Sequence, residues 1–182
     1  MRVITGKAKG RRLLSVPGAS TRPITDRTKE SLFNIISQDI LSASMLDLFA
    51  GTGSVGIEAL SRGAAFVRFI DINQNAILTI KKNLDLTGFL TAAQVIKGNS
   101  LTYLEREADF SFDYIYIAPP QYKELWIKTL IQLDNHSAWL SKNAWIIVQI
   151  HPVEFQNTDY NTFYQFDVRV YGSTQLLFFQ RK

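Results

Sequence analysis

Short apolar runs alternate with segments of helical periodicity along most of the chain. The apolar runs predict strands at residues 45–49, 66–71, 93–97, 112–117 and 144–150. The segments between them predict helices at residues 54–62, 75–86, 101–106 and 122–133. Strands that are apolar throughout are typical of a parallel sheet covered on both faces. The pattern therefore predicts a doubly wound α/β fold.

The two ends of the chain depart from this alternation. Residues 164–171 alternate between polar and apolar side chains, Gly172-Ser173 predicts a turn, and residues 174–179 form a second run, which together indicate an antiparallel hairpin. Near the N-terminus, residues 3–5 and 12–14 predict two short strands around a basic tip bracketed by glycines. A helix follows, with Thr25 or Asp26 as its N-cap and residues 29–36 as its body.

Composition narrows the class of protein. The chain has 182 residues, of which 46% are hydrophobic, enough for one well-buried domain. It has no cysteine and two histidines, His136 and His151, so we expect neither disulfides nor a metal site. We find no apolar run of about 20 residues to cross a membrane and no secretory signal. We expect a cytoplasmic monomer.

Charge is concentrated at the N-terminus. Residues 1–30 carry a net charge of +6, whereas the rest of the chain sums to −2. This asymmetry favours a basic arm that faces a polyanion, although a solvated surface segment is the structural alternative. The candidate phosphate-binding side chains are Lys7, Lys9, Arg11, Arg12, Arg22 and Arg27.

A glycine-rich turn between the first predicted strand and helix is the main candidate binding site. Gly51, Gly53 and Gly56 match the G-x-G-x-x-G spacing of nucleotide-binding strand–turn–helix units. Dinucleotide sites rarely carry an acid on that strand, whereas S-adenosylmethionine (SAM) sites commonly do, as Asp47 does here. Backbone N–H groups of the turn would hold the carboxylate of SAM and Asp47 its amino group; a structural acid is the alternative for Asp47. The predicted contacts are Asp47, Phe49, Ala50, Gly51, Thr52 and Gly53.

Two further strand ends complete the predicted cofactor site, since ligands bind outside the carboxyl ends of the strands. Asp71 lies about 20 residues after the glycine turn, the spacing of an acid that binds ribose hydroxyls, and Ile72 follows it. Asn99 and Ser100 follow the next strand and would contact adenine. The structural alternatives are a turn residue for Asp71 and a helix N-cap for Asn99.

The fourth strand end carries the candidate catalytic residues, in the sequence Ala118-Pro119-Pro120-Gln121-Tyr122. Two prolines remove two backbone donors and leave the carbonyls before them free. This resembles the D/N-P-P-Y/F motif of exocyclic-amine N-methyltransferases. An exocyclic amine is a poor nucleophile because its lone pair is delocalised into the ring. Hydrogen-bond acceptors favour its attack, and an aromatic ring, in this chain Tyr122, would stack on the flipped base.

With these residues in view, the chain resembles the RsmD family of bacterial 16S rRNA (guanine-N2)-methyltransferases over nearly its full length. The resemblance rests on the segments 2–6, 9–11, 21–34, 46–53, 58–64 and 171–174. Segment 21–34 is close to the signature R-P-T-x-D-R-x-[RK]-E-x-[LM]-F-N. The resemblance implies methyl transfer from SAM to a guanine in rRNA of the small ribosomal subunit. It implies a Rossmann-like class I methyltransferase fold with a seven-stranded, mostly parallel sheet.

We divide the chain into two parts. Residues 1–24 are a basic hairpin and linker, and residues 25–182 are a methyltransferase domain.

The chain departs from the family motif at Ala118, where relatives have Asp or Asn, and Gln121 precedes the aromatic residue. Gln149 also stands where relatives often have Glu. The Pro119 carbonyl with Gln121 or water could replace the missing acceptor, the substrate atom could differ, or the protein could bind SAM and RNA without turnover. An NAD-type dehydrogenase is a third function class, against which Asp47, Pro119-Pro120 and the terminal hairpin argue.

Overall fold

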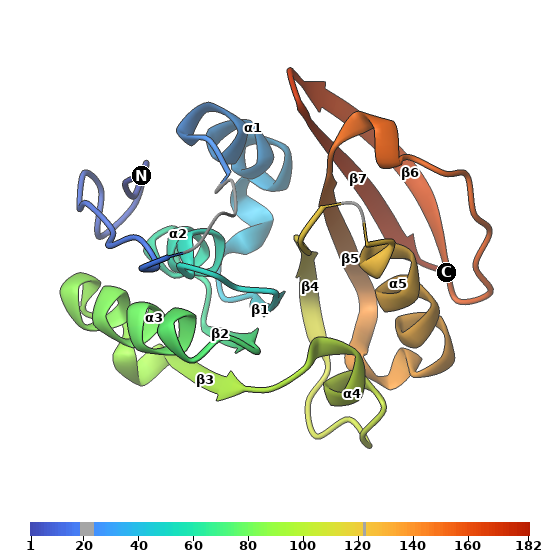
Figure 1. The fold of residues 1–182 in the computed structure, drawn as a ribbon, viewed down its shortest axis with the longest axis horizontal. Helices are drawn as coiled ribbons and strands as arrows, with labels where there is room; N and C mark the ends of the chain where they lie inside the picture. Colours follow the sequence, from blue (N-terminus) through green and yellow to red (C-terminus); the bar gives the residue numbers. More distant parts are fainter. Residues whose placement is uncertain (19–23, 122) are drawn as a thin grey trace.

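A seven-stranded sheet forms the centre of the computed structural model, which describes residues 1–18, 24–121 and 123–182 (Figure 1). Its strand order is β3-β2-β1-β4-β5-β7-β6. The strands are β1 (Ser44–Leu48), β2 (Phe66–Asp71), β3 (Ala93–Lys97), β4 (Phe112–Ile117), β5 (Leu140–Ile150), β6 (Phe163–Tyr171) and β7 (Thr174–Arg181). Strands β1 to β5 pair in parallel, whereas β7 runs antiparallel to both β5 and β6. The predicted mostly parallel sheet with an antiparallel C-terminal hairpin is confirmed.

Helices cover both faces of this sheet. They are α1 (Asp26–Ile36), α2 (Ser54–Ser61), α3 (Gln74–Thr87), α4 (Ser100–Leu104) and α5 (Leu125–Asn135), with short 3₁₀ turns at Ser37–Ile40, Leu90–Ala92, Ser137–Trp139 and Pro152–Glu154. Successive strand residues point to opposite faces, so Met45 packs in one apolar cluster with residues of α1, α2 and α3. Leu46 packs in a second cluster with residues of α4 and α5. None of the helices described is long and apolar enough to cross a membrane.

The predicted elements of the sheet domain agree with the structure to within a few residues. Thr25 is the N-cap of α1, because its hydroxyl oxygen accepts a hydrogen bond from the backbone N–H of Thr28 at 3.1 Å. The largest difference is in β5, which begins at Leu140 rather than at residue 144. Its polar start is held by the Ser141 hydroxyl, which donates to Asp113 at the start of β4 over 2.9 Å. Tertiary contact thus extends a strand beyond its apolar pattern.

The predicted strands at residues 3–5 and 12–14 do not form, but the two sides of the basic tip do pair in the antiparallel sense. Arg2 and Arg12 form a bridge, and the Val3 N–H donates to the Arg11 carbonyl at 2.9 Å. The backbone N–H groups of Ile4 and Thr5 donate to the Glu58 carboxylate of α2 at 2.7 and 3.0 Å instead of continuing a strand ladder. At Gly6, whose φ is +87°, a Cβ atom would lie 1.8 Å from the Ser61 carbonyl oxygen. We call residues 1–14 the N-terminal segment; it lies beside α2 and α3 (Figure 1).

Candidate functional site

The turn between β1 and α2, which we call the glycine loop (residues 49–53), lies at the carboxyl edge of the sheet. Phe49, Gly51 and Gly53 have left-handed backbone conformations, with φ of 63°, 56° and 75°. The Ala50 N–H donates to the Ile70 carbonyl at the end of β2 over 3.0 Å. The loop therefore stays close to the neighbouring strand, and α2 begins directly after it. By helix geometry, the first N–H groups of α2 have no acceptor within the helix and need one from outside it.

The third glycine of the motif has a packing role. A Cβ atom at Gly56 would lie 2.3 Å from Cε1 of Phe69 and 2.8 Å from Cγ1 of Val67, both on β2. Any side chain at this position would push α2 away from the sheet. Gly56 thus fixes how closely the first turn of α2 approaches β2, and with it the position of the glycine loop.

Asp47 lies under the glycine loop and is 2% exposed. Its Oδ2 accepts a hydrogen bond from the Gly56 N–H at 3.3 Å, so it satisfies a free donor in the first turn of α2. The pKa of Asp47 is raised to about 8, mainly by burial; the Gly56 N–H acts in the opposite direction, and the negative charge of Asp71 adds to the rise. Asp47 thus makes a structural contact through Oδ2, and its second oxygen, Oδ1, has no hydrogen bond within the described residues.

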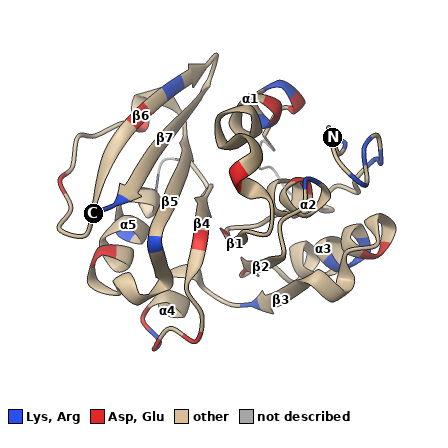
Figure 2. Ribbon diagram, turned by 180° about the vertical axis from the view of Figure 1, so that it is seen from behind, with Lys and Arg blue, Asp and Glu red and all other residues tan. Residues whose placement is uncertain are grey.

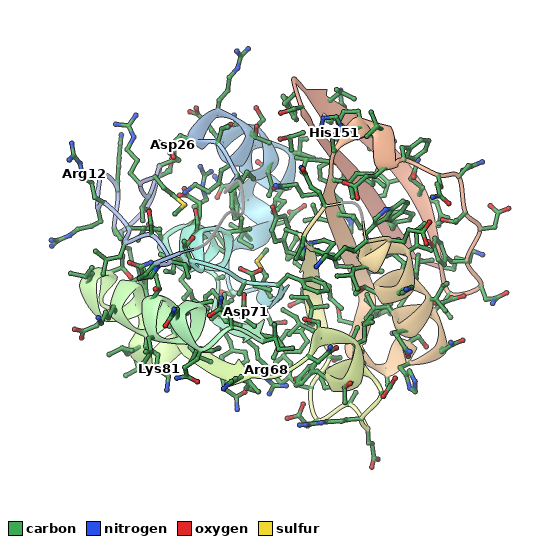
Figure 3. All side chains as sticks on the ribbon, in the orientation of Figure 1. Arg12, Asp26, Arg68, Asp71, Lys81 and His151 are labelled. Atoms are coloured by element: carbon green, nitrogen blue, oxygen red, sulfur yellow. The ribbon has the colours of Figure 1, made fainter. Side chains whose placement is uncertain are left out.

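Asp71, at the end of β2, also binds the glycine loop. Its Oδ2 accepts from the Gly51 N–H at 2.7 Å and its Oδ1 from the Asn73 N–H at 2.8 Å. A carboxylate offers about four lone-pair positions, so both oxygens can still accept from a diol. Ile72, the next residue, is 66% exposed and presents an apolar side chain that a flat ring could cover. Figure 3 labels Asp71 near the centre of the molecule, at this edge of the sheet.

Asn99 and Ser100 follow β3, at the same edge of the sheet. The Asn99 Oδ1 accepts from the backbone N–H groups of Leu101 and Thr102 at 2.9 and 3.3 Å, so Asn99 is the N-cap of α4. Asn99 is exposed and Ser100 is buried. Because Oδ1 already accepts these two hydrogen bonds, the Asn99 side chain can bind a ligand through its Nδ2 donor.

The fourth strand end brings Ala118 and Pro119 to the same edge of the sheet, both partly buried, followed by the exposed Pro120 and Gln121. Ala118 packs against the apolar cluster on the α1–α3 face and has no polar side-chain atom. Tyr122 and Arg22, both predicted site residues, lie outside the described residues.

Sequence reasoning missed a polar row beside this strand end. Tyr116 lies opposite Asp47 in the register of β4 with β1, and its hydroxyl donates to the Gln149 Oε1 on β5 at 2.5 Å. Burial, together with the nearby Asp47 carboxyl, raises the pKa of the Tyr116 hydroxyl well above its usual value. Tyr116 alternates with apolar residues of β4, so the sequence pattern marks it as core and gives no sign of this contact.

The N-terminal segment presents its basic side chains to solvent. Lys7, Lys9, Arg11 and Arg12 are exposed, as is Arg27 on α1. Figure 2 shows Lys and Arg gathered on this segment at the edge of the molecule, and Figure 3 shows Arg12 pointing outward from it.

Lys29, which belongs to the segment predicted to bind phosphate, is instead completely buried. Its ammonium group lies 3.6 Å from the Glu58 carboxylate, and both side chains are 0% exposed. Burial lowers the pKa of Lys29, while the charges of Glu58 and Asp26 act against this. Glu58 also accepts from the Arg62 guanidinium at 2.9 Å. Lys29 is therefore part of the packing of α1 on α2.

Metal-binding residue types do not gather at this site. Across residues 1–18, 24–121 and 123–182, no group of three or more His, Cys, Asp or Glu side chains is arranged to hold a metal ion. The polar groups described at the carboxyl edge are mainly carboxylates, backbone amides and the strand-end asparagines Asn73 and Asn99, with the exposed Ile72 side chain beside them. This donor set suits a ligand that carries ribose hydroxyls and an apolar ring.

Comparison with known proteins identifies relatives over most of the chain. The YlbH protein of Bacillus subtilis is 42% identical over 151 residues, which cover 82% of each chain. The ribosomal RNA small subunit methyltransferase D of Escherichia coli is 34% identical over 149 residues, covering 82% of this chain and 74% of the enzyme. The solved structure of the Escherichia coli yhhF protein covers 100% of this chain and 98% of its own, with 31% identity and a TM-score of 0.89.

One structure with a similar fold was solved with S-adenosylhomocysteine (SAH), the product that SAM leaves after methyl transfer. The SMU.776 protein, solved with SAH, covers 87% of this chain and 50% of its own with a TM-score of 0.70; at 13% identity this likeness is one of fold alone. The profile of the family described as Conserved hypothetical protein 95 matches residues 1–180. The chain therefore belongs to this family, which is the RsmD family that its sequence motifs resemble.

Proposed function

We propose that the protein is a cytoplasmic, SAM-dependent rRNA methyltransferase that modifies the exocyclic N2 of a guanine in the small ribosomal subunit. The observation that carries this proposal is the joining of three strand ends around the glycine loop. Asp71 binds Gly51 of the loop, and the Gly98 N–H after β3 donates to the Asp71 carbonyl at 3.0 Å. Family membership gives this arrangement its chemical meaning, because relatives are named rRNA methyltransferases.

Each part of SAM can be assigned to residues at the carboxyl edge of the sheet. Asp71 would accept from the ribose hydroxyls, and Ile72 would cover one face of the adenine, with Asn99 and Ser100 at its rim. The N–H groups at the start of α2 would bind the carboxylate of the methionine end. Asp47 would meet the amino group through its open oxygen. A cationic amino group next to Asp47 would favour the ionised carboxylate, so cofactor binding near neutral pH would release a proton.

The target guanine would enter beside Ala118 and Pro119. SAM, when bound, would supply a methyl group on a sulfonium. The N2–C bond would form as the S–C bond breaks, sulfur would keep the electron pair, and the proton lost from N2 would pass to solvent water. We assign the Pro119 carbonyl as the acceptor for the N2 hydrogens and Tyr122 as the residue that stacks on the base.

Residues 1–24 would act as an RNA-binding extension, and residues 25–182 as the methyltransferase domain. In the extension, the phosphate contacts would come from Lys7, Lys9, Arg11 and Arg12. Arg22 and Arg27 would extend the phosphate-binding surface.

Methyl transfer itself tests this proposal. The purified protein is incubated with SAM labelled on the methyl carbon and with either protein-free 16S rRNA or small ribosomal subunits. Label should appear in one of the two RNAs. Asp71→Asn should reduce the transfer at low SAM concentration, whereas Asp85→Asn, which changes an exposed acid on α3, should not. Absence of label in both RNAs, with measurable SAM binding, would contradict the enzymatic function.

Ala118 favours a second candidate, a SAM- and RNA-binding assembly factor with weak or no turnover. Its side chain cannot accept a hydrogen bond, and loss of one such transition-state partner costs about 10²–10³ in rate at comparable sites. Ala118→Asp separates the two candidates. A large gain in transfer would indicate a weakened natural site, whereas a loss would indicate a pocket that works with Ala118 in place.

A further inference from the structure

A buried asparagine on α3 joins the N-terminal segment to the glycine loop. Asn83 is 0% exposed. Its Oδ1 accepts from the Leu14 N–H at 2.8 Å, while its Nδ2 donates to the carbonyl oxygens of Leu14 at 3.1 Å and Thr52 at 2.9 Å. A primary amide has two N–H donors and one oxygen, so each polar atom of this side chain is used.

A second buried side chain makes a similar connection at the start of the chain. Lys29 on α1 donates to the carbonyl oxygen of Arg2 at 2.7 Å and to the Ser54 hydroxyl at 3.0 Å. Ser54 follows the glycine loop directly and begins α2. Both ends of the N-terminal segment are thus held by buried groups that also hold the glycine loop or the residue after it.

Movement of the glycine loop is therefore coupled to movement of the N-terminal segment. A buried donor or acceptor that loses its partner is left unsatisfied, which is unfavourable. If the Thr52 carbonyl shifted alone, Asn83 would lose a partner; if Asn83 followed it, the two bonds to Leu14 would be strained or lost. The lowest-cost movement keeps Thr52, Asn83 and Leu14 together. The exposed cations at residues 7–12 belong to the same segment.

We propose that Asn83 is a positioning residue that couples RNA binding by the N-terminal segment to cofactor binding by the glycine loop. This inference rests on the proposed function, since it assigns the two ligands to these two parts. RNA held on the segment fixes Leu14, and through Asn83 it fixes the Thr52 carbonyl in the loop. Coupling between two binding sites is reciprocal, so the cofactor also orders the segment for RNA.

Calorimetric titration tests the coupling with S-adenosylhomocysteine as the probe, in the absence and presence of saturating 16S rRNA. Asn83→Asp keeps the side-chain shape and the acceptor for the Leu14 N–H. It replaces with oxygen the Nδ2 group that donates to the carbonyls of Thr52 and Leu14. Thr79→Val is the matched control, because Thr79 is a buried polar residue one turn earlier on α3 whose hydroxyl donates within its own helix to the Asn75 carbonyl at 2.8 Å.

The unsubstituted protein and Thr79→Val should bind the probe about fivefold more tightly with RNA, the lower end of typical couplings. For Asn83→Asp the ratio should fall below that of Thr79→Val, because the connection through Asn83 is lost and only the one through Lys29 remains. A ratio of one in the unsubstituted protein, or an unchanged ratio in Asn83→Asp, overturns the coupling. Failure of the unsubstituted protein to bind the probe overturns the proposed function itself, and the coupling with it.

Hydrogen exchange on the unsubstituted protein tests the same inference without any substitution, in case Asn83→Asp does not fold. The probe should slow exchange of backbone amides in residues 1–14 more than in the hairpin formed by β6 and β7, which has no contact with Asn83. Equal effects on the two segments, with the probe bound, overturn the coupling.

Discussion

Replacing Asp47 with Asn removes a buried carboxyl group from the folded protein and keeps the shape of the side chain. The Asn oxygen can still accept from the Gly56 N–H, which the carboxyl group binds at 3.3 Å. Since burial raises the pKa of Asp47 from 3.8 to about 8, the folded protein binds one more proton than the unfolded chain between these pH values. Stability from this group is therefore complete below pH 3.8 and is lost as pH rises toward 8.

The magnitude follows from the shift. Each pH unit in this window removes about 1.4 kcal/mol of stability, so the loss from Asp47 between pH 3.8 and pH 7 is about 4 kcal/mol. Asp47→Asn abolishes that loss. We expect the variant to be more stable than the unsubstituted protein at pH 7, by up to about 4 kcal/mol. We also expect it to bind the cofactor more weakly, because the charge that would meet the amino group is absent.

Urea unfolding at pH 5, 6, 7 and 8 measures this effect, with Asp85→Asn as a control for removal of an exposed carboxylate. The stability of the unsubstituted protein relative to Asp47→Asn should decline steadily across the series, while Asp85→Asn should follow the unsubstituted protein to within about 0.5 kcal/mol. A constant difference from pH 5 to pH 8, or a variant that is less stable at pH 7, would refute the reasoning about Asp47.

Three further substitutions test other parts of the account. Gly56→Ala should lower the free energy of unfolding by about 1–3 kcal/mol in urea titration, because the new Cβ atom would meet Phe69; unchanged stability would contradict this packing role. Glu58→Gln should cost about 3–5 kcal/mol in the same assay, because the buried Lys29 ammonium would lose its charge partner; a loss below 1 kcal/mol would show that the pair contributes little. Arg11→Ala should leave stability unchanged and reduce the slope of log affinity for rRNA against log salt by about 0.7, whereas an unchanged slope would exclude a phosphate contact.

The sequence was most informative where each strand is buried on both faces. Apolar runs predict β1, β2 and β4 closely, because buried parallel strands need such runs. Alternation and the turn at Gly172 likewise predict the terminal hairpin. The polar start of β5 could not be predicted, because residues 140–143 are held by pairing and by the Asp113 contact rather than by their own pattern.

The N-terminal segment shows why a pattern of strand-like residues can mislead. Ile4 and Thr5 would suit a strand, but the Glu58 carboxylate, more than 50 positions away, takes their N–H groups. The Glu58 carboxylate also pairs with Lys29 and explains why this lysine is buried. The local sequence around Lys29 is basic and would place it on the surface. Long-range partners of this kind have no local signature.

At the candidate site, glycine spacing and strand ends predict which residues meet at the carboxyl edge, but not which atoms are already in use. Asp71 and Asn99 lie where the spacing predicts, yet both also bind backbone N–H groups. Tyr116 and Asn83 carry no motif, and their polar contacts become visible only when strands and helices are packed together.

Nucleoside analysis of the reaction product tests the proposed function most directly. Small ribosomal subunits or 16S rRNA that have reacted with the protein and SAM are digested to nucleosides, which are then identified by mass spectrometry. The account predicts N2-methylguanosine that is absent when the protein is omitted. Methylation of adenine, or no methylated nucleoside from a protein that binds SAM, would contradict it.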